Sequence, residues 1–246
     1  MKRNPIVYLT IPLLCFLVGG CGFISGNKNS DVQKAIKIAE DQYGVKFELK
    51  KKAFFSGGAN CNVIVRCDQL PGQDIRIFRF DNRTAVQCDY IYLKYGDKAC
   101  EKISEVIHTV LPDAKVVISE FGYNHFSGTR YDKNTTLSDY LWDNTFVIEV
   151  VTYGEYDESE IRQLFNNLAK TLTDKGINAY GFKVYVMNSR EAVDAIKTYE
   201  HMPDTQSYEG IRSDDIRLYA ALNYGRLAEY EEDSEDPSLL SIHVED

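Results

Sequence analysis

Hydrophobic and polar positions repeat with two different periods along this chain, and the period predicts the type of element. In residues 31–43, 97–111 and 157–175, apolar side chains recur every three or four positions, as in a helix that buries one face. Ser189 is a favourable residue at a helix N-cap and predicts a further short helix to about residue 199. Residues 239–244, near the end of the chain, predict a frayed edge strand. Alternation with period two, typical of strands, occurs in residues 45–49, 60–67, 75–80, 85–95, 115–121, 145–152, 182–186 and 216–222.

The ends of the predicted helices carry residues that satisfy backbone groups at helix termini. Ser30 is followed three positions later by Gln33, and Asp157 by Glu160, which is the spacing of a capping box. Gly44 follows the first helix, where glycine commonly ends a helix. These signals predict the boundaries of the first and third helices.

Strands predominate between residues 45 and 95, and the connections between them are short. Turn signals at residues 56–58, 71–72 and 81–82 separate four consecutive strands, so neighbouring strands are expected to pair antiparallel with the first helix across one face. The second half alternates strands with helices and predicts a mixed sheet. The expected fold class is therefore α+β: an antiparallel meander with a packed helix, then a second mixed α/β sheet unit.

The first twenty residues follow neither period. Lys2 and Arg3 precede an almost unbroken apolar run from residue 6 to residue 18, and small residues follow it, which is the form of a secretory signal. An apolar run of about 13 residues is too short to cross a hydrocarbon core about 30 Å thick as a helix. We expect residues 1–20 to be a signal peptide.

The sequence at the end of this leader, Val18-Gly19-Gly20-Cys21, resembles the lipobox of bacterial lipoproteins. The resemblance implies that the Cys21 thiol receives a diacylglyceryl group and becomes the first residue of the mature protein. Two acyl chains anchor a protein stably, whereas a single chain binds only marginally. The implied partner is the cell membrane, on its extracytoplasmic face. Ordinary secretion with cleavage near Gly20, or an uncleaved anchor, are the alternatives.

The remaining chain divides into a tether, two modules and a tail. The opening of the first module, residues 39–47 (AEDQYGVKF), resembles that of uncharacterised lipoproteins of Gram-positive bacteria, a resemblance that carries no catalytic motif. The expected parts are a lipidated tether (21–30), a helix-plus-meander module (31–112), a second α+β module (113–228) and an acidic tail expected to be disordered (229–246).

The balance of charge argues against nucleic acid as a partner. The chain has 28 lysines and arginines against 37 acidic residues, a formal net charge of −9. Loss of Lys2 and Arg3 with the leader makes the charge −11. Nucleic acids and anionic lipid surfaces attract positive protein surfaces. Membrane attachment is therefore expected to come from the lipid and not from protein charge.

Four cysteines remain once Cys15 leaves with the leader and Cys21 is acylated. In an oxidising exterior, an even number allows up to two disulfides. The first two lie about 20 Å apart on one predicted strand, beyond the ~7 Å limit between the Cα atoms of a bridge, so each pairs with one of the others or stays a buried thiol. The candidates are Cys61, Cys67, Cys88 and Cys100.

Motifs for catalysis and metal binding are missing from the sequence. It has no Gly-x-Ser-x-Gly, Walker loop, dinucleotide fingerprint, His-Glu-x-x-His or Cys-x-x-Cys pattern. None of the four histidines has a second histidine at metal-ligand spacing. We therefore expect no cofactor and no metal, and we assign no catalytic residue.

The segment from residue 121 to residue 144 is the candidate binding region. It is long for a connection inside a compact domain, and such segments often carry function. Aromatic rings with polar edges suit sugars and peptides, because they offer contact area at little entropic cost. The structural alternative is a lid over a sheet edge, with Trp142 buried. The candidate ligand-binding residues are Tyr123, His125, Tyr131, Tyr140 and Trp142.

The sequence is compatible with three functions. The leading hypothesis is a non-enzymatic binding or interaction module at the cell envelope, with a glycan, peptide or protein ligand. An envelope hydrolase would need two facing carboxylates, which the sequence does not identify. A structural or assembly partner would pair exposed strand edges with another envelope protein.

Overall fold

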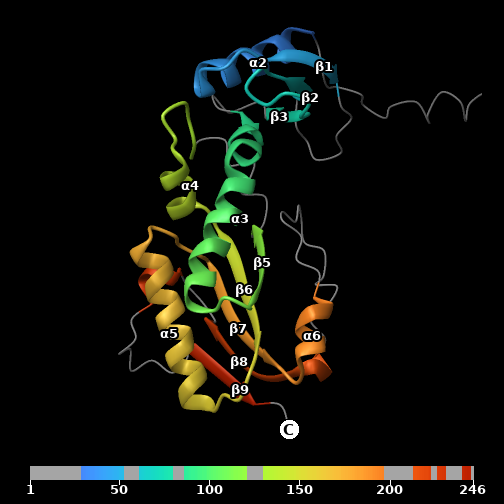
Figure 1. Ribbon diagram of the computed structural model, residues 1–246. Coiled ribbons are helices and arrows are strands. Elements are labelled where there is room, and N and C mark those ends of the chain that lie inside the picture. The colour runs from blue at the N-terminus through green and yellow to red at the C-terminus, as the bar shows by residue number, and fades with distance from the viewer. Residues whose placement is uncertain are drawn as a thin grey trace, which may run out of the picture.

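The chain folds into two sheets that one long helix connects (Figure 1). The computed structural model describes residues 29–52, 61–79, 86–120, 130–196, 213–222, 226–230 and 240–244. The predicted α+β class is confirmed, with a four-stranded antiparallel sheet in the first half and a five-stranded mixed sheet in the second. The leader, Cys21 and the tether up to residue 28 lie outside the described residues.

The first sheet is a meander of four antiparallel strands in the order β1-β2-β3-β4. Helix α2 (Asn29–Tyr43) packs against β2 and β3 with the apolar stripe that the sequence predicts. Gly44 follows it with φ 66°, and its N–H donates to the carbonyl of Glu40 at 2.8 Å, so the predicted helix end is confirmed. The strands are β1 (Glu48–Lys52), β2 (Cys61–Arg66), β3 (Ile75–Arg79) and β4 (Gln87–Cys88).

The prediction of a strand over residues 85–95 is wrong beyond the short β4. Helix α3 (Tyr90–Val110) begins inside this stretch, whereas the sequence pattern placed its start near residue 97. The aromatic and β-branched side chains at the start of α3 favour a strand locally. Burial of Tyr90 decides the outcome: its ring packs against Tyr43 and Phe47, with ring centroids 5.4 and 5.8 Å apart. Tertiary packing therefore overrides local propensity here.

The second sheet has the strand order β5-β6-β7-β8-β9. β6 and β7 are parallel, and the other pairs are antiparallel. A parallel pair needs a crossover, which helix α5 (Glu158–Asp174) provides. Its capping box is confirmed: Asp157 accepts the Glu160 N–H at 2.8 Å, and Glu160 accepts the Asp157 N–H at 2.9 Å. The strands are β5 (Lys115–Glu120), β6 (Phe146–Tyr153), β7 (Gly181–Met187), β8 (Ile216–Leu222) and β9 (Leu240–Val244).

The two faces of the second sheet are covered by different helices (Figure 1). On one face α5 inserts Phe165 against Phe182 of β7, with ring centroids 4.9 Å apart, and α3 continues the same core. On the other face the short helix α6 (Arg190–Ala195) closes a smaller core that includes Val151 and Met187. Among the described residues, the larger core also contains side chains of the first sheet, and α3 contacts both β3 and β5.

Short helices occur where the sequence pattern predicted irregular chain or a longer helix. The segment 122–144, expected to be a long loop, contains helix α4 (Leu137–Asp143), which Thr136 caps. Ser189 caps α6 as predicted, but Ile196 is extended, so α6 ends before residue 199. Two 3-10 turns flank β8, η2 (Ser213–Asp215) and η3 (Leu227–Glu229).

The C-terminal strand β9 pairs with β8 at one edge of the second sheet, as predicted for residues 239–244. Most of the acidic stretch before it, residues 231–239, lies outside the described residues. Across the ranges that the structure describes, no helix combines the length and apolar character needed to span a membrane.

Candidate functional site

A groove of about 880 Å³ lies between helix α3 and strand β5. The helix lines it with one face, because positions three or four apart follow one another along a helix surface. The volume is in the range of about 300–1,000 Å³ that is typical of ligand pockets. The helical face carries Asp97, Glu101, Ser104, Glu105 and His108.

Strand β5 forms the opposite wall and is an edge of the second sheet. Among the described strands it pairs only with β6, in a register that runs from Lys115 opposite Val151 to Glu120 opposite Phe146. In an antiparallel pair, every second residue directs its N–H and C=O away from the partner strand. The central apolar side chains of β5 are buried. The outer edge of this strand therefore offers backbone hydrogen-bonding groups.

The lining of the groove is predominantly negative. Among the described lining residues, five carboxylates stand against two cations, Lys115 and Arg190. One of the five, Glu105, also pairs with Lys102 at 3.3 Å. Both partners of that pair are exposed, and such surface pairs contribute only about 0.2–1 kcal/mol, so a ligand can replace Lys102 at little cost. The carboxylates are those of Asp97, Glu101, Glu105, Asp113 and Asp194.

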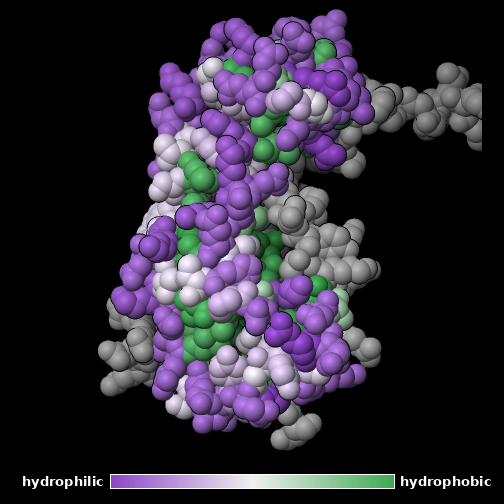
Figure 2. Space-filling model, viewed as in Figure 1, coloured by the Kyte–Doolittle hydropathy of each residue, from purple (hydrophilic) through white to green (hydrophobic). Residues whose placement is uncertain are grey.

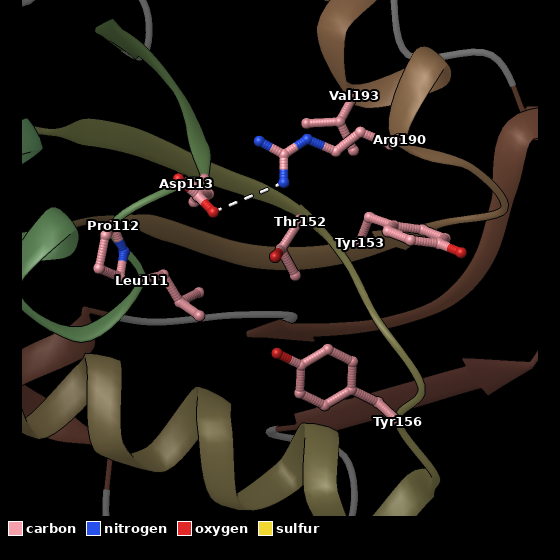
Figure 3. Close-up of a pocket in the computed structure, with 9 residues that line it drawn as sticks. Leu111, Pro112, Asp113, Thr152, Tyr153, Tyr156, Arg190 and Val193 are labelled. Carbon is pink, nitrogen blue, oxygen red and sulfur yellow. Dashed lines mark hydrogen bonds and ion pairs between the residues drawn. The ribbon is translucent and has the colours of Figure 1, made fainter.

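An ion pair stands where the groove meets a smaller pocket of about 210 Å³ (Figure 3). Arg190, the first residue of α6, approaches Asp113 of the turn after α3, with Nη1 and Oδ2 3.5 Å apart. Both side chains are more than half exposed, so this pair also contributes little to stability. Figure 3 shows Thr152, Tyr153 and Tyr156 lining the smaller pocket beside the pair. Arg190 Nε also lies 3.9 Å from Asp194 Oδ1, so a ligand that binds here would compete with two weak ion pairs.

A second cluster of polar side chains lies on the sheet face that carries α6. Tyr185, Tyr219 and His243 are direct partners on three neighbouring strands, with ring centroids 5.6 and 4.6 Å apart. Beside them the Glu149 carboxylate is only 1% exposed; it accepts the Tyr185 hydroxyl at 3.3 Å and lies 3.2 Å from the Lys183 ammonium. A buried carboxylate needs such partners. We interpret this cluster as structural.

The four candidate disulfide cysteines are buried free thiols in the structure. Burial raises the pKa of Cys61 to about 11 and the pKa of Cys88 well above its ordinary value. The thiolate is the reactive form of cysteine, so burial makes these two thiols poor nucleophiles. They serve as apolar core side chains, a role that free cysteine commonly has. The four residues are Cys61, Cys67, Cys88 and Cys100.

The aromatic residues predicted to bind a ligand do not form one surface. Tyr123 and His125 lie outside the described residues. Tyr131 and Tyr140 are 7% and 1% exposed, and their rings pack 5.6 Å apart in the core. Trp142 is 42% exposed, so the alternative in which it is buried is wrong. Of the three described rings, only that of Trp142 presents substantial surface to a ligand.

The groove between α3 and β5 was not predicted from the sequence. Its local signal is the acidic row at Asp97, Glu101 and Glu105, four residues apart on one helix. The edge position of β5 depends on long-range strand pairing and has no local signal.

Among the described residues, no group of three or more His, Cys, Asp or Glu is arranged to hold a metal ion. Comparisons with protein-family models, with curated proteins and with solved structures give no match for this chain.

Proposed function

We propose that this protein is a lipid-anchored, non-enzymatic binding module on the extracytoplasmic face of a bacterial cell membrane. The apolar leader and the sequence Val18-Gly19-Gly20-Cys21 support the anchor. The groove between α3 and β5 is the observation that carries the binding role, because it combines ligand-sized volume, a strand edge and a charged lining.

The anchor is tested by a matched pair of cysteine variants expressed in a bacterial host. Cys21→Ala removes the thiol that lipidation requires, so we expect the protein to leave the membrane fraction or to accumulate as unprocessed precursor. Cys15→Ala lies in the leader, is lost with it, and should leave fractionation unchanged. Intact-mass measurement of the membrane-bound protein should show cleavage before Cys21 and added lipid. Unchanged membrane attachment and mass in Cys21→Ala would refute the anchor.

A further inference from the structure

We propose that the groove binds an extended, basic segment of another protein, which pairs with β5 and adds a sixth strand to the second sheet. This inference rests on the proposed binding function and names the class of its ligand. It follows from three features of the groove: the edge of β5 that no other described strand pairs with, the spacing of the acidic side chains, and the sign of the charge.

The strand edge supplies the main-chain interactions. β5 has six residues and, among the described strands, one partner, so its outer edge can pair with an incoming strand of similar length. Six residues of extended chain span about 20 Å. Addition of a peptide strand to a sheet edge is a recurrent mode of recognition, in which the backbone bonds give affinity and alternate side chains give specificity. The groove beside β5 is the space that such a strand would fill.

The acidic side chains on α3 have the spacing of alternate side chains on a strand. Asp97, Glu101 and Glu105 are four residues apart, which places neighbouring Cα atoms about 6 Å apart along the helix axis. On an extended peptide, side chains on one face recur about every 6.6 Å. Figure 1 shows α3 and β5 side by side, so a peptide paired with β5 would follow α3. Basic residues at every second position would then meet the successive carboxylates.

The negative charge of the groove indicates which kind of protein segment would bind in it. Figure 2 shows hydrophilic side chains over the outer face of α3, and those that line the groove are mainly acidic. A second copy of this chain would bring its own acidic wall to the same edge, and the whole chain has a net charge of −9. Like charges brought together oppose association, whereas opposite charges favour it. A basic segment from a different protein fits better than a second copy.

The test uses the lipidated mature protein in detergent micelles and a labelled seven-residue peptide in which lysine alternates with threonine or valine. Fluorescence anisotropy at low and at physiological salt should show binding that salt weakens. Three control peptides should bind more weakly: one with glutamate in place of lysine, one with the lysines grouped at one end, and one N-methylated at alternate backbone nitrogens. The last control removes strand pairing and retains the charge.

Two protein variants localise the binding. Glu101→Gln with Glu105→Gln should weaken binding of the alternating peptide about five-fold or more. The matched control, Glu48→Gln with Asp68→Asn, removes two exposed acids from the first half of the chain and should leave affinity unchanged. Hydrogen exchange provides the backbone readout: amides within residues 115–120 should exchange more slowly when the peptide is bound.

Several results would overturn the inference. These are absence of binding by the alternating peptide, equal affinity of the Glu101/Glu105 variant and the wild type, and unchanged exchange of residues 115–120 on binding. A concentration-dependent dimer in which β5 becomes protected would assign the edge to a second copy. None of these results affects the Cys21 experiment, so a failure here is distinguishable from a failure of the proposed anchor.

Discussion

Asp89 is a buried carboxyl at the junction between the first sheet and α3, and its ionisation should control stability near neutral pH. Its side chain is 9% exposed and accepts the backbone N–H of Arg76 at 2.8 Å. Burial raises the pKa of Asp89 to about 7, although the hydrogen bond from Arg76 opposes this rise. The substitution Asp89→Asn keeps an oxygen acceptor for Arg76 and removes the titrating group.

The expected effect follows from the difference between the folded and unfolded pKa. In the unfolded chain the pKa of an aspartate is about 3.9. Between pH 4 and pH 7 the folded protein therefore binds more protons than the unfolded chain, and stability falls as the pH rises. Integrated from pH 5 to pH 8, ionisation of Asp89 lowers the free energy of unfolding by roughly 3 kcal/mol. The Asn variant lacks this contribution.

The measurement is urea unfolding, followed by far-UV circular dichroism, at several values between pH 5 and pH 8. The wild type should lose stability relative to Asp89→Asn as the pH rises, by roughly 3 kcal/mol in total. Asp68→Asn, an exposed carboxyl nearby in the sequence, is the control and should follow the wild type. If the curves of wild type and Asp89→Asn run parallel across this range, the carboxyl does not titrate there and the reasoning fails.

Two further substitutions test the cores. Phe165→Ala removes a fully buried ring that packs on Phe182, and it should lower the free energy of unfolding by about 3–5 kcal/mol. The control is Leu164→Ala, at a half-buried neighbouring position, which should lower the free energy of unfolding clearly less. Equal losses in the two variants would contradict the assigned core face. Lys183→Met removes the ammonium group that pairs with the buried Glu149 carboxylate, and it should lower the free energy of unfolding by about 1–3 kcal/mol. An unchanged urea midpoint would show that this ion pair does not contribute to stability.

The elements that the sequence predicted correctly are those in which local signals and tertiary burial agree. Helix α5 has an apolar stripe, a capping box at Asp157 and Glu160, and glycine at position 176 with φ 71°, and all three agree with its observed limits. The first meander was predictable for the same reason, since only a few residues separate neighbouring strands and leave them little choice except antiparallel pairing.

The errors occur where distant contacts decide the local structure. Tyr90 begins a helix because Tyr43 and Phe47 bury its ring, and neither residue is near it in the sequence. In the candidate binding region, helix α4 turns Tyr140 into the core while Trp142 remains exposed, a difference that an aromatic count cannot show. The groove depends on which strand lies at the edge of the second sheet, and that order is set by the crossover between β6 and β7.

The proposed anchor and the groove also constrain how the protein sits at the membrane. Cys21 precedes Asn29, the first residue of α2, by eight residues, and an extended chain spans at most about 3.6 Å per residue. If Cys21 carries the proposed lipid, α2 would begin within roughly 30 Å of it. α3 has 21 residues and is about 31 Å long, and it extends from the first sheet to the second (Figure 1). The groove is lined by residues of its middle and C-terminal turns, from Asp97 to His108. An anionic membrane surface repels an acidic groove. We therefore expect the first sheet to face the membrane and the groove to face outward, where a basic segment of an envelope partner can reach it.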